Sequence, residues 1–172
     1  MCIRDSIDTL GKTIEPPKYS EIGGCYNNTL TIKVKEQWGV WENGIEDFDH
    51  PELYFKKPEN SPLFSAECVA LETEEERKKY SEKASLMQLY RNIKYPPYAR
   101  ENGVQGSVVI QFIINTKGDV EDVQVAKSIG GGCDQEALRV VREKLMKWHQ
   151  PGRQDGMAVN TIFYLPIRYR LE

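Results

Sequence analysis

The residues of this sequence that could do acid–base or nucleophilic chemistry are few and scattered. Only two histidines occur, His50 and His149, and an activated nucleophile needs such a base beside a cysteine or serine, together with an orienting acid. His50 precedes a proline in an acidic turn, and His149 follows a tryptophan, where a polar surface histidine is the ordinary outcome. No carboxylate pair is suggested by spacing. We therefore expect no enzyme activity and no catalytic residue.

Two glycine-containing segments raise the question of phosphate binding. The GKT sequence at residues 11–13 ends like a phosphate loop, but the glycine that this motif requires upstream of Gly11 is Ser6. Three glycines at 130–132 precede a predicted helix, whose N-terminus could hold an anion weakly. Because there is no dinucleotide fingerprint and no parallel βαβ unit, we interpret them as a flexible turn and expect no cofactor.

The composition describes an ordinary globular protein of 172 residues, with 40% apolar and 28% charged residues and a net charge of −3. This charge gives no electrostatic case for nucleic-acid binding. Cys25, Cys68 and Cys133 are too widely spaced for a metal motif. We expect buried free thiols, and a Cys25–Cys68 disulfide in an oxidising compartment stays an alternative.

The opening sequence MCIRDS, residues 1–6, matches an in-frame translation of a sequencing-library adapter. We predict that it is not native and leave it out of the fold argument. No run of about 18 apolar residues is present, and no start resembles a signal peptide. Because the sequence reads as a fragment, we expect that an upstream anchor or signal peptide could have been lost.

The first half of the chain is expected to be an accessory region at 7–70 followed by a connector helix at 71–91. Alternation predicts strands at 29–34 and 52–57, with a hairpin or packed loop between them. The helical segment is acidic first and basic later, an order that suits the helix dipole. Its apolar stripe is weak, so we expect a solvated helix that docks only at its end.

The pattern becomes sharper over residues 92–172, which we predict to be a separate domain. A short proline-initiated helix comes first, followed by alternating strands near 107–114 and 120–129 that a tight turn joins. Asp134 is expected to cap a helix that carries Leu138, Val141, Leu145 and Trp148 on one side. We expect Pro151 to end this helix, and a long alternating strand at 158–171 to follow.

This order of elements predicts an α+β fold, a small three-stranded antiparallel sheet with helices packed on one face. Pro166 lies within the last strand and has no N–H to give to a ladder, so this strand is expected at an edge of the sheet. An exposed apolar edge strand is a hazard unless a partner pairs with it. The sequence therefore points to a strand-docking module.

The same residues resemble the TonB C-terminal domain family over about residues 92–171. The resemblance rests on four segments in order, YPPYARENGVQGSVVIQFIINTKGDVEDVQVAKS, CDQEALRVV, KWHQPGRQDG and LPIRYRL. A tyrosine–proline pair, a strand hairpin, an Asp-x-x-Ala helix and a final Pro-Ile-x-Tyr-x-Leu strand stand at compatible spacings. None of these elements is specific alone, but their order and spacing are.

The resemblance implies a periplasmic energy transducer held in the inner membrane by a segment absent from this fragment. Such a protein works with a proton-driven inner-membrane motor complex. Its C-terminal domain binds the TonB box of outer-membrane TonB-dependent transporters as an added strand, and transmits force that drives nutrient import. A non-transducing envelope protein that uses the domain as a static interaction or sensor module is the alternative, and a homodimer through the exposed edge also stays open.

The resemblance also implies a set of partner-binding residues. Tyr95 and Pro96 stand at the family's tyrosine–proline pair, and Asn92 stands where some members place a glutamine that meets the box. The last strand would pair with the box, mainly over residues 160–169. The expected contact residues are thus Asn92, Tyr95, Pro96, Asn160, Ile162, Tyr164 and Arg168.

One departure from the family concerns residues 7–91. The usual spacer is rich in proline and charged residues, whereas this region carries two tryptophans, five tyrosines and strand-like runs. We interpret it as folded. It can be an accessory domain or, since PPKYSEIGG faintly resembles PPYARENG, a degenerate copy of the later module.

Overall fold

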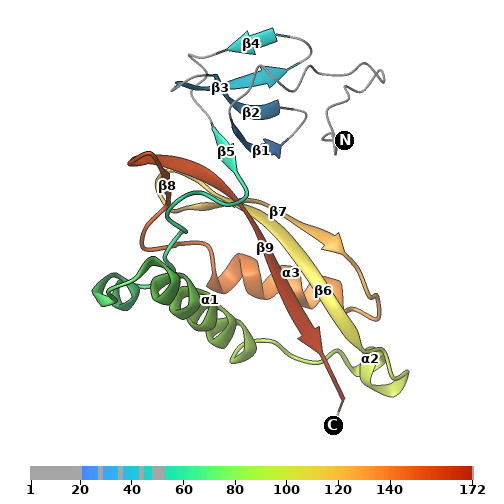
Figure 1. Cartoon of the computed structure of the whole chain (residues 1–172). Coiled ribbons are helices and arrows are strands. Elements are labelled where there is room, and N and C mark those ends of the chain that lie inside the picture. The colour runs from blue at the N-terminus through green and yellow to red at the C-terminus, as the bar shows by residue number, and fades with distance from the viewer. Residues whose placement is uncertain (1–20, 27–28, 35–36, 43–44, 48–52, 172) are drawn as a thin grey trace.

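The computed structural model describes residues 21–26, 29–34, 37–42, 45–47 and 53–171. Two sheets are present in this part of the chain, a four-stranded meander near the N-terminus and a five-stranded sheet built mainly by the C-terminal half (Figure 1). The histidine at position 50 and the GKT segment at 11–13 lie outside the described residues. No helix in the described part is long and apolar enough to cross a membrane.

The C-terminal half has the predicted α+β architecture. Strands β6 (Gly106–Ile114), β7 (Val120–Lys127) and β9 (Met157–Tyr169) form an antiparallel sheet in the order β9-β6-β7. Helices α1 (Glu74–Tyr90) and α3 (Cys133–Lys144) lie against one face of it, and the short α2 (Pro97–Glu101) lies beside the start of β6 (Figure 1). Among the described residues, no helix lies over the other face (Figure 1).

Strand alternation supplies the core between the sheet and the helices. Successive side chains of a strand point to opposite faces, and in β6 and β9 one set is buried against α1 and α3. This set and the facing helix residues include Val108, Ile110, Phe112, Leu165, Ile167, Leu89, Val140 and Val141. The alternation read from the sequence is confirmed.

Helix α1 begins with a capping box that sequence analysis did not single out. The Thr73 hydroxyl accepts the Glu76 N–H at 3.2 Å, and the Glu76 carboxylate accepts the Thr73 N–H. The prediction that this helix docks only at its end is wrong, because Ser81 and Ser85 are buried as well as Leu89. The Ser81 hydroxyl accepts the Phe64 N–H and donates to the Pro62 carbonyl, so polar contacts replace the missing apolar stripe.

Helix α3 differs from the prediction at both ends. Its N-cap is Gly132, with φ 85°, and the Asp134 carboxylate instead accepts the N–H groups of Ile129 and Gly130, which folds the glycine turn. The helix ends at Lys144, before Trp148 and Pro151. Trp148 is nevertheless buried, because its ring packs against Phe64, Phe112 and Phe163.

Gly118 in the β6–β7 turn is required by two constraints. Its φ is 80°, and a Cβ added there would lie 2.5 Å from the Trp148 carbonyl oxygen. The Gly118 carbonyl also accepts the Trp148 N–H at 2.8 Å. The turn therefore anchors the tryptophan segment as well as reversing the chain.

The N-terminal meander contains β1 (Glu21–Tyr26), β2 (Thr29–Val34), β3 (Gln37–Glu42) and β4 (Ile45–Asp47), each antiparallel to the next. The strand predicted at 29–34 is confirmed, and the hairpin alternative holds for the tryptophan-containing segment. The strand predicted at 52–57 is present only as β5 (Tyr54–Phe55). A 3₁₀ helix, η2 (Ala66–Ala70), then leads to α1.

The meander is attached to the C-terminal sheet through the hairpin of β8 (Gly152–Gln154) and β9. In the turn of this hairpin, the Asp155 carboxylate accepts the Trp38 indole N–H at 2.8 Å and the Lys33 ammonium at 3.2 Å. Trp38 also packs edge-to-face on Phe55, with ring centroids 4.7 Å apart. These contacts bring β5 to the side of β9 that faces away from β6.

The Cys68 and Cys133 thiols are free and buried. Buried free thiols are thus confirmed for these two residues, and the disulfide alternative at Cys68 is wrong.

Candidate functional site

The outer edge of β9, the side opposite β6, is the candidate site. β9 pairs with β6 without a break from Gly106↔Tyr169 to Ile114↔Thr161. On β9 the Asn160 N–H donates away from β6 to the Leu53 carbonyl at 3.1 Å, and the Arg168 N–H donates to the Tyr90 hydroxyl at 3.0 Å. Because backbone direction alternates in an antiparallel ladder, the even-numbered residues between them also direct their backbone groups outward.

The upper part of this edge is covered by the chain itself. β5 pairs in parallel with β9 at Asn160 and Thr161. Asn160 is 7% exposed, and its side-chain oxygen accepts the Thr116 N–H. Ile162 is also buried, in a small cluster with Ile113 and Tyr54 on the open face of the sheet. Strand addition at Asn160 would have to displace β5.

The lower part of the edge, residues 162–168, has no strand beside it among the described residues. Tyr164 is 44% exposed, and Pro166 and Arg168 are exposed as well. Pro166 removes the one outward N–H that would lie between those of Tyr164 and Arg168. The prediction that β9 lies at an edge therefore holds for its lower part and is wrong at residues 160–161, where β5 pairs with it.

The tyrosine–proline entry packs beneath the end of β9. The Tyr95 ring lies edge-to-face against Tyr169, with centroids 5.5 Å apart, and its hydroxyl donates to the Val104 carbonyl. Pro96 lies against Gly132, where an added Cβ would be 3.3 Å from the Pro96 Cβ. Both positions therefore have a packing role in the described chain.

Asn92 also has a structural role in the described chain. Its side-chain amide donates to the Gln88 main-chain carbonyl at 2.7 Å, and its main-chain carbonyl accepts a hydrogen bond from the Arg139 guanidinium. The neighbouring Lys94 N–H donates to Glu136 at 2.8 Å. The connector from α1 to α2 is thus bound to α3, which holds the entry segment in place.

Charges on α3 stabilise this attachment. Arg139 lies 2.7 Å from both Glu136 and Glu143, and its hydrogen bond holds the pKa of Glu136 below the usual value, with a further contribution from the Lys94 N–H. Burial raises the pKa of Tyr169, whose hydroxyl donates to the Cys133 carbonyl at 2.9 Å. Tyr169 therefore stays neutral and serves as a packing surface for the entry segment.

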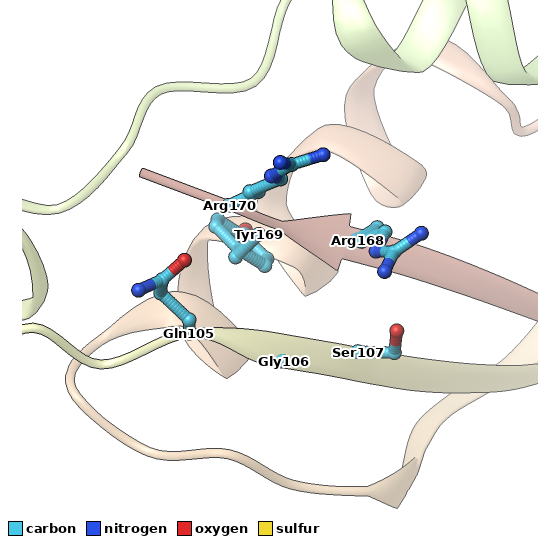
Figure 2. A pocket seen from close by; sticks show the side chains of 6 residues that line it. All are labelled: Gln105, Gly106, Ser107, Arg168, Tyr169 and Arg170. Atoms are coloured by element: carbon cyan, nitrogen blue, oxygen red, sulfur yellow. The ribbon is translucent and has the colours of Figure 1, made fainter. Parts of the chain in front are cut away.

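A polar hollow of about 430 Å³ lies at the open end of the β6–β9 pair. Figure 2 shows Arg168 and Arg170 from the end of β9, together with Gln105 and Ser107 from the start of β6. The Gln105 side chain accepts the Leu171 N–H, which fixes the end of the chain. Neither arginine takes part in a salt bridge with another described residue.

Metal-binding and catalytic arrangements are not seen in the described part of the chain. No group of three or more histidine, cysteine or acidic side chains lies close enough there to hold a metal ion. His149 is exposed at the end of the helix-to-strand connection. What this part of the chain offers a partner is a row of main-chain hydrogen-bonding groups at the outer edge of β9.

A helix-backed sheet with an open edge on its last strand defines a small α+β module of the kind that can accept an extended segment by strand addition. Residues 91–171 match the family described as Gram-negative bacterial TonB protein C-terminal, so this part of the chain is a TonB C-terminal domain. The resemblance found over residues 92–171 is confirmed.

A curated relative, protein TonB of Vibrio cholerae, is 29% identical over 93 residues. The match covers 53% of this chain and 36% of the relative, so the chain spans about a third of that protein's length. Two NMR solution structures of the Helicobacter pylori TonB C-terminal domain are also similar. They are 22% and 21% identical with TM-scores of 0.42 and 0.43, and cover 51% and 62% of this chain and 90% of each neighbour.

Sequence analysis missed two contributors to the edge, Tyr90 and the segment Leu53–Phe55. Both act through hydrogen bonds between residues far apart in the chain, 78 positions in the case of Tyr90 and Arg168. No local pattern marks such a contact. The only hint in the sequence was Tyr90 itself, an aromatic residue at the end of an otherwise polar helix, for which no core contact was predicted.

Proposed function

We propose that this chain is part of a TonB-type energy transducer and that the lower edge of β9 binds an extended segment of an outer-membrane transporter. The observation that carries the proposal is the row of outward backbone groups at residues 162–168 of β9, which no strand of the described chain covers. Main-chain hydrogen bonds would supply the affinity, and side chains of Tyr164 and Arg168 would adjust the register.

The proposal includes a place of action and a second partner. The domain would act in the periplasm, and a proton-driven complex of the inner membrane would supply the force, through an anchor in that membrane. Support comes from the family match at 91–171. A force applied to a strand that pairs along β9 would be shared among the hydrogen bonds between the two strands. The nine-pair ladder between β9 and β6 would then pass this force into the core.

Backbone pairing can be separated from side-chain contact at Tyr164. Its N–H points outward, so Tyr164→Pro removes a docking donor and leaves the ladder with β6 intact. Synthetic peptides from the N-terminal segments of outer-membrane transporters would be titrated calorimetrically. We expect Tyr164→Pro to weaken binding about tenfold or more, because it removes one hydrogen bond and adds a ring at the edge.

Tyr164→Ala is the matched control, since it also removes the phenol but keeps the N–H. Binding within a few-fold of the unsubstituted protein is expected for this variant. Equal losses in both variants would show that the side chain, and not the backbone edge, makes the contact. Circular dichroism would verify that both variants are folded.

A second function is favoured by the N-terminal meander. Its attachment through Asp155, Trp38 and Lys33 shows that the described strands before α1 are folded, whereas the family's usual spacer is rich in proline and charged residues. A static interaction or sensor module of the cell envelope fits this feature. No binding of any transporter peptide by the unsubstituted protein would favour this second function.

A further inference from the structure

Tyr90 lies against the backbone edge of β9. It is the last residue of α1, is 45% exposed, and its hydroxyl accepts the outward N–H of Arg168 at 3.0 Å. The phenol is not part of the buried core. A side-chain oxygen thus occupies a main-chain donor that an added strand would use.

The other end of the open edge is closed in a comparable way. The outward N–H of Asn160 donates to the Leu53 carbonyl, and β5 follows beside β9. Between the two closed ends, Pro166 has no N–H. The outward groups left for a partner are therefore centred on Tyr164, and carbonyls outnumber N–H groups among them.

We propose that Tyr90 is a specificity-determining residue that ends the docking edge and limits the added strand to a short extended segment. This inference rests on the proposed function. At about 3.3 Å per residue, the edge from Ile162 to Pro166 accommodates roughly five residues. The segment must bring N–H groups opposite the β9 carbonyls, so a proline facing Pro166 is excluded.

Replacing the phenol by phenylalanine tests the role of the hydroxyl. In Tyr90→Phe the ring stays on α1, and the Arg168 N–H becomes available to a partner carbonyl. Longer peptides then gain one hydrogen bond. We expect their affinity to rise about 2- to 10-fold, whereas peptides of about five residues keep their affinity.

The experiment uses the full chain and a series of end-blocked transporter peptides of about five to nine residues. Tyr80→Phe is the matched control, because Tyr80 lies on the same helix with similar exposure, 41%, and its hydroxyl is 3.5 Å from Glu67, away from β9. Titration calorimetry gives the affinities. Amide hydrogen exchange without peptide gives the protection of the Arg168 N–H.

Each outcome distinguishes the inference from the function on which it rests. Affinity that stops rising at about five residues in the unsubstituted protein, and rises further with length only in Tyr90→Phe, supports the inference. Peptides that bind both proteins with the same length dependence overturn it and leave strand docking intact. If neither protein binds a peptide, the proposed function is overturned. The proposed role of Tyr90 is then overturned as well, even if the Arg168 N–H loses its protection from hydrogen exchange in Tyr90→Phe.

Discussion

The two halves of the β9 outer edge differ although they belong to one continuous strand. The upper half is paired with β5 at residues 160–161, and its Asn160 is almost fully buried. The lower half contains an exposed Tyr164, a proline and the Arg168 N–H, which donates to the Tyr90 hydroxyl. The same backbone is therefore closed at one end and available at the other.

The comparison shows that the surrounding elements, and not the strand itself, decide where an edge is open. The upper half is closed by β5, which is held in turn by Phe55 against Trp38 and by the Thr31 hydroxyl on the Tyr54 N–H. The lower half is kept from uncontrolled pairing by Pro166, a known protection of edge strands. Substitutions in either half can shift this boundary.

The largest effect is expected from Phe55→Ala, which would open the upper half. Phe55 is 2% exposed and packs with Trp38 and Val159. Truncating a buried phenylalanine costs about 3–5 kcal/mol, which is more than a two-residue strand supplies, so β5 should leave β9. Hydrogen exchange at the Asn160 amide should then approach the rate at Tyr164.

Tyr98→Ala is the control for this experiment, because Tyr98 is 65% exposed and its loss should change stability by less than about 0.5 kcal/mol. Continued protection of Asn160 in Phe55→Ala would mean that β5 pairs without its aromatic anchor. The contrast between the two halves would then have to arise within β9.

An intermediate effect is expected at Asp155, whose carboxylate ties the meander to the β8–β9 turn. The Trp38 indole N–H, and then the Lys33 ammonium, hold the pKa of this carboxyl below its usual value. Its contribution to stability is therefore full above the unfolded-state pKa of about 3.9, and is lost as the pH falls through the folded-state pKa. Exchange of the Trp38 indole hydrogen should increase over that acidic range.

Asp155→Asn removes the charge and keeps an oxygen acceptor and a residue that tolerates the φ of 49°. We expect a severalfold rise in Asn160 exchange at neutral pH and loss of the acid dependence at Trp38. Asp119→Asn is the control, since Asp119 pairs with Lys147. An unchanged pH profile in Asp155→Asn would assign the acid dependence to another group.

The C-terminal sheet could be predicted from sequence because its signals are local. Alternation marked β6, β7 and β9, and a proline marked the start of α2. One failure is also local. Asp134 was interpreted as a helix cap, but its carboxylate accepts the N–H groups of the glycine turn four and five residues before it, an alternative that the same residue type allows.

The candidate site was less predictable than the fold. The sequence placed a proline-containing strand at an edge, which is confirmed for the lower half of β9. It could not show that β5 pairs with residues 160–161, because a two-residue parallel bridge has no periodicity. Nor could it assign Asn92, whose side chain caps α1 by bonding the Gln88 carbonyl.

The smallest effect is expected from Pro166→Ala, which sharpens the comparison within the open half. The substitution restores an outward N–H between those of Tyr164 and Arg168, so a docked peptide gains one hydrogen bond and should bind about 2- to 10-fold more tightly. The same donor makes the edge more accessible to a second copy of the chain, and sedimentation should detect more self-association.

Pro97→Ala is the control, because Pro97 is an exposed proline in the first turn of α2, away from the ladder. Unchanged or weaker peptide binding in Pro166→Ala would show that the added strand does not extend to this position, and that the usable edge ends at Tyr164.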